Sequence, residues 1–363
     1  RKVFKILSKF NKCKKLVIVS PFQFIYRRGI ERFTYSLANQ LAKDFDIRVV
    51  IYAWSSQDKI FWGNWHGNIK IREIPFSRYF QKFWAIIFYR IWFFIDKPKK
   101  VIINFFYHGE EYLKKNLDYF YVLHSPANLI PSRYEYINRN ISKFLSIKLI
   151  AVSNFVKSEA EKHVKDYSIK VIYNGVDTLK FSKKNKNEPK KIIRLITLSA
   201  LEERKGIQYV ILALKKLNNP KIRYNIYGDG DYKAELKEMI KVTNQEKWIQ
   251  IFPSISSPEK YLINSEIYIL LSKGEAFPLG PLEAMSCGLP IIVSNHQPYN
   301  EFVNENVGLR INSNSISDIG KAINFFLDNK VREKFGTNGR IMIEKGFEWK
   351  RVGDEYYKTI FNG

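Results

Sequence analysis

The sequence predicts an α/β protein with two parallel sheets, each covered by helices on both faces. One observation is that short, continuous apolar runs alternate with amphipathic segments along most of the chain. A second is that this alternation stops near a lysine-rich stretch, 183–191 (KKNKNEPKK), and then starts again. A third is that 363 residues are too many for one ordinary hydrophobic core and suit two domains.

The first half of the chain supplies the elements of one sheet. Its apolar runs are short and continuous, which is typical of strands that are buried on both faces. A helix is predicted over 31–43 (ERFTYSLANQLAK), after the first strand and a loop. The predicted strands are 15–21, 47–53, 100–106, 119–123 and 148–152.

A second series of elements follows the turn dipeptide Asn174-Gly175 and the lysine-rich stretch. Its predicted strands are 194–199, 223–227, 266–271 and 290–293, and its predicted helices lie near 206–217, 232–242 and 316–328. We therefore predict Rossmann-like, doubly wound domains over 1–182 and 183–347, and a C-terminal helix within 348–363 that packs back on the first domain. Ligands of such folds bind beyond the carboxyl ends of the strands, so the two domains are expected to face a cleft that holds the ligand.

The net charge of +25 is unevenly distributed. Residues 1–180 contain 32 Lys and Arg against 14 Asp and Glu, a net charge of +18, whereas the remainder carries +7. Such a basic half suits nucleic acid, an anionic membrane or a phosphorylated substrate, or is simply a soluble surface. Zinc-finger spacing, an RNP-like aromatic signature and a basic-leucine heptad are all missing from the sequence, so we expect no nucleic-acid partner.

The two cysteines, Cys13 and Cys287, are far apart in the sequence, which argues against a disulfide framework and a cysteine-based metal cluster. No signal peptide is visible at the N-terminus, so we expect a cytoplasmic protein. Peripheral binding to the inner face of the cell membrane stays open because of residues 79–95 (YFQKFWAIIFYRIWFFI). This aromatic segment has basic flanks and is too interrupted for a transmembrane span. It is either a helix packed on the sheet or an interfacial helix on an anionic membrane.

The strongest chemical signal is a pair of glutamates, Glu275 and Glu283, with seven residues between them (GEAFPLGPLEAMSCGLP, 274–290). The Gly and Pro residues rule out one continuous helix, so we place Glu275 in a loop and Glu283 in the first turn of a helix that begins near Pro281 and ends before Gly288. Such a helix start offers backbone N–H groups to phosphate or sugar oxygens, and carboxylates accept hydrogen bonds from sugar hydroxyls. Alternatively, Glu283 merely stabilises its own helix start.

With its flanks, this stretch resembles the E-x7-E signature of retaining glycosyltransferases with the two-domain GT-B fold, in particular glycosyltransferase family 4. Further matches occur in order over almost the whole chain: RRGIERFTYSLANQLA, LHSP, AVSNFVKSEA, VIYNGVDTLKF, LSALEERKGIQYVILAL and NIYGDGDYKAEL. The resemblance implies a GT-B architecture with an acceptor-binding first domain and a second domain that binds a nucleotide sugar.

The resemblance also implies roles for individual residues. Glu275 and His124 would be catalytic, with Glu275 near the reacting face of the donor sugar and His124 opposite it. Glu283 would hold the ribose, and the backbone around Phe277, Leu279 and Gly280 would approach sugar hydroxyls or phosphate. Lys205 with Arg204 would neutralise the diphosphate leaving group, and Gly29 would let the backbone pass close to phosphate.

Two positions depart from the family pattern. Ser199-Ala200 stands where the family usually has Gly-Arg, so one phosphate-binding cation is missing unless Arg204 replaces it. Arg28 replaces the first of two glycines and either narrows that loop or adds a cation to the substrate-binding set.

Other chemistries are less favoured. Asp229-Gly230-Asp231 has the form of a metal-binding DxD motif, but its glycines indicate a strand-to-helix turn, so we expect no metal and no cofactor. The sequence thus predicts a metal-independent, retaining hexosyltransferase. It would move a sugar from a nucleoside diphosphate donor to a cell-envelope glycan or lipid-linked acceptor, in polysaccharide or lipopolysaccharide synthesis. The alternatives are a sugar-nucleotide epimerase of the same fold and a non-enzymatic binding protein.

Overall fold

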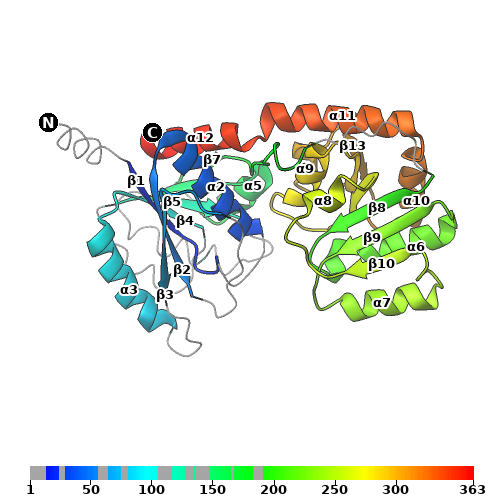
Figure 1. Cartoon of the computed structure of the whole chain (residues 1–363), viewed down its shortest axis with the longest axis horizontal. Coiled ribbons are helices and arrows are strands. Elements are labelled where there is room, and N and C mark those ends of the chain that lie inside the picture. Colours follow the sequence, from blue (N-terminus) through cyan, green and yellow to red (C-terminus); the bar gives the residue numbers. More distant parts are fainter. Residues whose placement is uncertain are drawn as a thin grey trace. The chain divides into compact units, whose positions relative to one another are not determined.

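The structure is a computed structural model that describes residues 14–23, 29–55, 64–74, 81–104, 117–126, 135, 147–164, 167–182 and 191–363. The chain forms two compact units (Figure 1). One consists of Arg1–Asn174 together with Trp349–Gly363, and the other of Gly175–Glu348.

The first unit is built on a parallel sheet of seven strands in the order β3-β2-β1-β4-β5-β6-β7. Its strands are β1 (Lys15–Val19), β2 (Arg48–Trp54), β3 (Ile69–Ile74), β4 (Lys100–Ile103), β5 (Asp118–Leu123), β6 (Ile147–Ala151) and β7 (Ile169–Val171). The central strands are almost completely buried, which explains why they read as continuous apolar runs. The edge strands β3 and β7 are more exposed and carry polar residues within the strand, so neither was predicted from the sequence.

Four helices of the first unit have bounds in the described part: α2 (Gly29–Phe45), α3 (Gln81–Asp96), α5 (Asn154–Glu161) and α12 (Trp349–Phe361). Helix α12 packs on α2 and thereby joins the C-terminal end of the chain to the first unit. The contact is close at Gly353, where a Cβ atom would lie 2.6 Å from Cγ of Gln40. Phe33 of α2 lies beneath it and contacts Trp349 and Tyr356 of α12, with ring centroids 5.8 and 5.6 Å apart.

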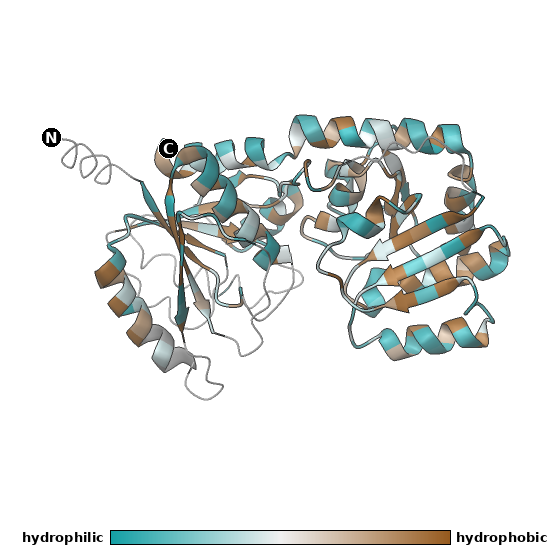
Figure 2. Cartoon of the chain, in the orientation of Figure 1, coloured by the Kyte–Doolittle hydropathy of each residue, from teal (hydrophilic) through white to brown (hydrophobic). Residues whose placement is uncertain are grey.

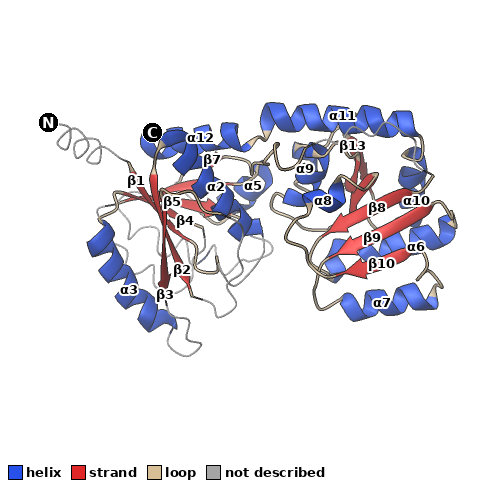
Figure 3. Ribbon diagram, viewed as in Figure 1, coloured by secondary structure: helices blue, strands red, loops and turns tan. Residues whose placement is uncertain are grey.

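The second unit contains a parallel sheet of six strands in the order β10-β9-β8-β11-β12-β13. The strands are β8 (Ile193–Leu198), β9 (Ile222–Tyr227), β10 (Ile249–Phe252), β11 (Ile267–Leu270), β12 (Ile291–Ser294) and β13 (Gly308–Ile311). The helices are α6 (Ile207–Leu217), α7 (Lys233–Val242), α8 (Glu259–Leu262), α9 (Leu279–Ser286), α10 (Ile316–Phe325) and α11 (Asn329–Gly346), drawn as blue ribbons in Figure 3. Apolar side chains from β8, β9, β11, α6 and α10 form its core.

Residues 175–182, which the sequence analysis assigned to the first domain, pack within the second unit. The Arg340 guanidinium of α11 donates to the carbonyl oxygens of Thr178 and Phe181 at 3.1 and 2.7 Å. It also donates to the Ser286 carbonyl at 2.8 Å, and Ser286 Oγ donates to the Phe181 carbonyl at 2.7 Å. These bonds fix the segment against α9 and α11.

Both sheets therefore have the predicted doubly wound form, which confirms the α/β fold class with two parallel-sheet units. In each sheet the strand order reverses at one place, between β1 and β4 in the first unit and between β8 and β11 in the second. Loops that leave such neighbouring strands diverge and open a crevice beyond the carboxyl ends, the usual ligand site of these folds. These two switch points are where functional residues are expected.

Candidate active site at the two switch points

At the switch point of the second unit, the turn after β8 meets the loop after β11. The turn is a short 3-10 helix, Glu203–Lys205, and it ends at Gly206 with φ of 72°. A Cβ atom at Gly206 would lie 2.6 Å from the carbonyl oxygen of Leu271, so only glycine allows this close approach and this left-handed backbone. Lys273 N–H donates to the Arg204 carbonyl at 2.9 Å and joins the two segments again.

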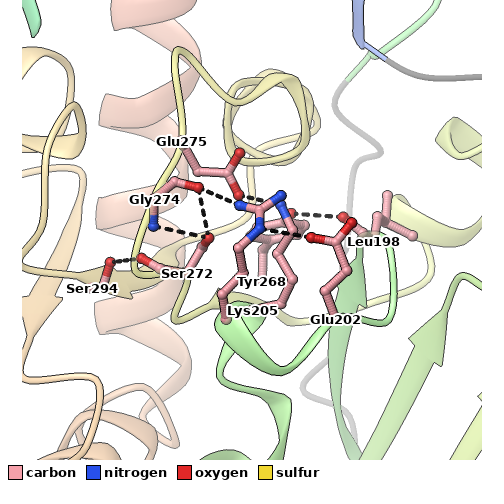
Figure 4. A network of polar contacts seen from close by, with 9 residues as sticks. Leu198, Glu202, Lys205, Tyr268, Ser272, Gly274, Glu275 and Ser294 are labelled. Atoms are coloured by element: carbon pink, nitrogen blue, oxygen red, sulfur yellow. Dashed lines mark hydrogen bonds and ion pairs between the residues drawn. The ribbon is translucent and has the colours of Figure 1, made fainter. Parts of the chain in front are cut away.

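Three predicted site residues come together there. Lys205 Nζ lies 2.5 Å from Glu275 Oε1, and the two side chains are only 9% and 15% exposed (Figure 4). The Arg204 guanidinium donates to the Gly274 carbonyl and, through Nε, to Glu202 Oε2 at 2.7 Å. The second unit thus holds two cations and one candidate catalytic carboxylate at the β8/β11 switch point. Lys205 and Glu275 form a largely desolvated pair, in which electrostatic interactions are strengthened, whereas the Arg204 side chain is 40% exposed.

The loop that carries Glu275 is held by hydrogen bonds between uncharged groups (Figure 4). Ser294 Oγ donates to the Ser272 carbonyl at 2.5 Å, and Ser272 Oγ donates to the Gly274 carbonyl at 3.2 Å. Tyr299 lies fully buried nearby, and its burial, followed by the charge of Glu275, raises the pKa of its hydroxyl well above the usual value. A rigid loop of this kind fixes the direction of the Glu275 carboxylate.

Helix α9 corrects one local prediction. It begins at Leu279 rather than near Pro281, because Pro278 is extended (ψ of 129°) and acts as the N-cap residue. Glu283 therefore lies beyond the first turn of α9, and that first turn contains no acidic residue. The Glu283 residue is only 4% exposed. The interpretation of Glu283 as a mere stabiliser of its helix start loses its geometric basis, since that effect falls off within the first turn.

The remaining loop residues differ in surroundings. Phe277 is buried against Phe302 and Phe347, with centroid distances of 5.2 and 5.8 Å. Leu279 and Gly280 are half-buried at the start of α9. A Cβ atom at Gly280 would lie 2.3 Å from the Tyr268 hydroxyl, so glycine is required there for packing.

In the first unit, His124 directly follows β5 and is half-buried. Its Nε2 atom lies 3.4 Å from Oδ1 of Asn104, and its ring meets the Phe33 ring edge-on, with centroids 4.7 Å apart. Gly29 is exposed as the first residue of α2, and a Cβ atom there would meet no atom of the described chain within 4 Å. Arg28 lies outside the described residues.

Comparisons with known proteins bear on both units. The family model described as Glycosyltransferase Family 4 matches residues 27–180, and the model described as Glycosyl transferases group 1 matches residues 177–342. The chain belongs to the GT-B glycosyltransferases of the family 4 type. The family assignment made from the sequence is thereby confirmed.

Relatives of this glycosyltransferase agree with that assignment. An uncharacterised glycosyltransferase of Methanocaldococcus jannaschii is 25% identical over 96% of this chain and 98% of its own. The UDP-Gal:α-D-GlcNAc-diphosphoundecaprenol α-1,3-galactosyltransferase of Escherichia coli is 34% identical over 56% of this chain and 57% of its own. HepE of Anabaena, solved with UDP-glucose, has a TM-score of 0.77 at 16% identity and covers 95% of this chain and 98% of its own, which shows a shared fold.

The alternative metal motif has a structural explanation in this glycosyltransferase. Asp229 Oδ1 accepts hydrogen bonds from Gly230 N–H and from Lys233 Nζ, both at 3.2 Å. The Lys233 contact and charge lower the pKa of the Asp229 carboxyl. Asp229 therefore stabilises the turn into α7, as the glycine pattern indicated.

Several polar residues near the two switch points were not identified from the sequence. Asn104 directly follows β4 and Ser20 directly follows β1, whereas Ser272 lies two positions after the end of β11. Each is at most 2% exposed. Their shared signal is a polar side chain directly after a buried strand, and in a doubly wound sheet this position is where ligands approach.

Proposed function

We propose that this glycosyltransferase transfers a hexose-type sugar from a nucleoside diphosphate donor to a cell-envelope glycan or lipid-linked acceptor, with retention of configuration and without a metal ion. The observation that carries the proposal is the contact of Lys205 with Glu275 beside Arg204, at the β8/β11 switch point. The name of the galactosyltransferase relative, with a UDP-sugar donor and a diphosphoundecaprenol-linked acceptor, supports both substrate classes.

The donor half of the proposal rests on charge. Departure of a nucleoside diphosphate develops negative charge, and preorganised cations aimed at that charge lower the barrier. Lys205 and Arg204 can supply this role, with Arg204 in place of the arginine missing at Ser199-Ala200 and Arg28 as a further cation. Glu275 pairs with Lys205 at 2.5 Å. A bound diphosphate would take over Lys205 and leave the carboxylate to accept hydrogen bonds from the donor sugar.

The other candidate residues fit around such a donor. We assign Glu283 to the ribose diol, and the Leu279 and Gly280 N–H groups at the start of α9 to phosphate or sugar oxygens. Pro278 has no N–H to contribute, and Phe277 supports the loop by packing. His124 would face the reacting sugar, and Gly29 has the open surroundings that a close approach of substrate to the backbone needs.

The acceptor half of the proposal rests on helix α3. Its inner face packs on the sheet, where Tyr89, Trp92 and Phe93 contact Tyr52. Its outer face exposes large apolar side chains, and much of the α3 ribbon has the brown colour of hydrophobic residues in Figure 2. The exposed fractions are Trp84 36%, Ile91 46%, Phe94 70% and Ile95 52%. The packed face fits a helix that covers the sheet, and we assign the exposed face of the described helix 81–96 to the interfacial interpretation.

Exposed cations border this apolar face. Arg90 lies within α3, and Lys97 and Lys99 follow its end, whereas Asp96, the acidic residue of the helix, is buried. Apolar and basic groups side by side match the interface of an anionic membrane. No described helix is long and apolar enough to span a bilayer. We therefore propose peripheral binding through α3 to the inner face of the cell membrane.

The donor assignment is tested by ligand-induced stabilisation. UDP, GDP and ADP and their common sugar derivatives are added separately, and the melting temperature is measured with and without EDTA. One nucleotide series should raise the melting temperature irrespective of EDTA. Transfer to a lipid-linked acceptor, followed by NMR of the anomeric centre, should then show retention. A change of sugar identity without any acceptor would favour the epimerase, and failure of all three series would exclude a nucleotide-sugar enzyme.

The membrane assignment has a separate test. Co-sedimentation with vesicles of phosphatidylglycerol and phosphatidylcholine is measured at low and high salt. The Phe94→Ser/Ile95→Ser variant should lose most binding to the anionic vesicles, whereas Phe325→Ser in α10, a 46% exposed apolar residue of the other unit, should bind like the wild type. Equal binding of both variants would rule out the outer face of α3 as the membrane contact.

A further inference from the structure

A cluster of buried polar side chains lies at the switch point of the first sheet. Ser20 follows β1, Asn104 follows β4, and Thr34 projects from α2, and these three are 2%, 1% and 0% exposed. The Asn104 N–H donates to the Val19 carbonyl at 3.2 Å and fixes its backbone beside β1. Burial of a hydroxyl or an amide costs free energy unless its hydrogen bonds are satisfied, so the arrangement of these bonds is informative.

The bonds run in one direction. Thr34 Oγ1 donates its single hydrogen to the Ile30 carbonyl at 3.0 Å, one turn earlier in α2. It can therefore only accept from Asn104, whose Nδ2 lies 2.7 Å away. If the Asn104 amide were inverted, its oxygen would lie 2.7 Å from Thr34 Oγ1 without a hydrogen between the two oxygen atoms. The Asn104 carbonyl oxygen Oδ1 must consequently face away from Thr34, toward His124.

This direction determines the state of the His124 ring. Asn104 Oδ1 lies 3.4 Å from His124 Nε2, and an amide oxygen can only accept, so Nε2 carries a hydrogen. In the neutral ring the lone pair is then on Nδ1. The Phe33 ring holds the imidazole edge-on at a centroid distance of 4.7 Å, with an interplanar angle of 70°. Phe33 is in turn backed by Trp349 and Tyr356 of α12.

We propose that Asn104 is a positioning residue for the glycosyl transfer: it orients the His124 ring and keeps its hydrogen on Nε2. This inference rests on the proposed function only for the role of His124. The 3.4 Å contact is at the long end of the range for a hydrogen bond.

The state of the ring is measured without any activity. Histidines are labelled with ¹⁵N, and the His124 signals are assigned with a His124→Asn variant. Wild type should show a protonated-type shift at Nε2 and an unprotonated-type shift at Nδ1. Asn104→Leu should give a mixture of tautomers. A ring protonated on Nδ1 in the wild type, or an unchanged pattern in Asn104→Leu, would overturn the proposal.

Kinetics then separate positioning from a merely structural role. Asn104→Leu should lower kcat about tenfold, the value of one hydrogen bond in the transition state, with a smaller change in the KM for the donor. In a His124→Asn background the same change should have no further effect, because Asn104 acts through that ring. If His124→Asn itself leaves transfer unchanged, the proposed role of His124 is wrong. If His124→Asn lowers the rate of transfer but Asn104→Leu leaves it unchanged, the positioning inference is wrong.

Discussion

The two switch points occupy equivalent places in the two sheets but are built from different chemistry. At β1/β4 the polar groups are neutral: Ser20, Thr34 and Asn104 bond to one another and to His124. At β8/β11 they are ionic, with Lys205 on Glu275 and Arg204 on the Gly274 carbonyl. The difference teaches that the second unit is suited to a ligand that brings negative charge, whereas the first is suited to orienting a side chain by hydrogen bonds.

The largest effect should follow from removing a cation at the ionic switch point. Lys205→Met should lower kcat about a thousandfold, because no cation then compensates the departing diphosphate at that position. Steady-state transfer assays measure this change. The matched control is Lys273→Met, which removes an exposed lysine two residues before Glu275 and should cost less than about threefold. A loss below tenfold for Lys205→Met would contradict the assignment of leaving-group stabilisation to this lysine.

Glu275→Gln makes the ionic switch point resemble the neutral one. The change leaves shape and acceptor oxygen in place but removes the charge that pairs with Lys205. We expect kcat to fall about a hundredfold, while calorimetric affinity for the nucleoside diphosphate stays the same or rises because Lys205 has lost its competitor. Weaker nucleotide binding with unchanged kcat would show that Glu275 holds the nucleotide and not the sugar.

The sequence was sufficient for the features that depend on local pattern. Buried central strands such as 119–123 and 194–199 appear as apolar runs, and Glu275 and Glu283 were found in a loop and a helix as expected. Edge strands were missed because their exposed faces break the run, as in β3 with its exposed Lys70 and in β13 with its exposed Arg310. Helix α11 was not predicted either, and its Arg340 determines where residues 175–182 pack.

Contacts between distant segments could not be predicted from one sequence. Lys205 and Glu275 are seventy residues apart, and only the parallel pairing of β8 with β11 brings their loops together. Asn104 and His124 depend in the same way on the pairing of β4 with β5. The start of α9 at Leu279 depends on the backbone angle of Pro278. The sequence pattern instead favoured a start near Pro281. Strand order, which is a property of the whole sheet, therefore limited the prediction of both sites.

Glu283→Gln should have a more moderate effect, confined to nucleotide binding. If the buried Glu283 carboxylate accepts from the ribose hydroxyls, its neutral analogue should bind the nucleoside diphosphate about tenfold more weakly, the value of one charged hydrogen bond. Calorimetry with the nucleotide and with inorganic diphosphate tests this, since the latter has no ribose and should bind equally to wild type and variant. An equal loss for both ligands would indicate a general disturbance of α9.

The smallest effect concerns stability and separates the neutral switch point from a charged pair of its unit. Arg72 donates to both carboxylate oxygens of Asp96 at the end of α3, at 2.9 and 3.2 Å, and Tyr52 donates to Oδ2 at 3.0 Å. Burial opposes ionisation of Asp96, but the bonds from Arg72 and Tyr52 prevail and lower the pKa of this carboxyl below its usual value. A lowered carboxyl pKa stabilises the folded state above the unfolded-state pKa, about 4, and the contribution is lost as the pH falls through the folded-state value.

Asp96→Asn should therefore cost about 1 kcal/mol of unfolding free energy at neutral pH and almost nothing once the pH lies below the lowered folded-state pKa of this carboxyl, where the wild-type side chain is protonated too. Denaturant unfolding at several pH values measures the difference. Asn104→Leu, in the neutral switch point, should lose a similar amount that does not follow the titration of Asp96, because Asn104 and Thr34 do not titrate. Parallel pH curves for both variants would mean that Asp96 is not ionised in the folded protein. The contrast between the neutral switch point and the charged pair at the end of α3 would then no longer hold.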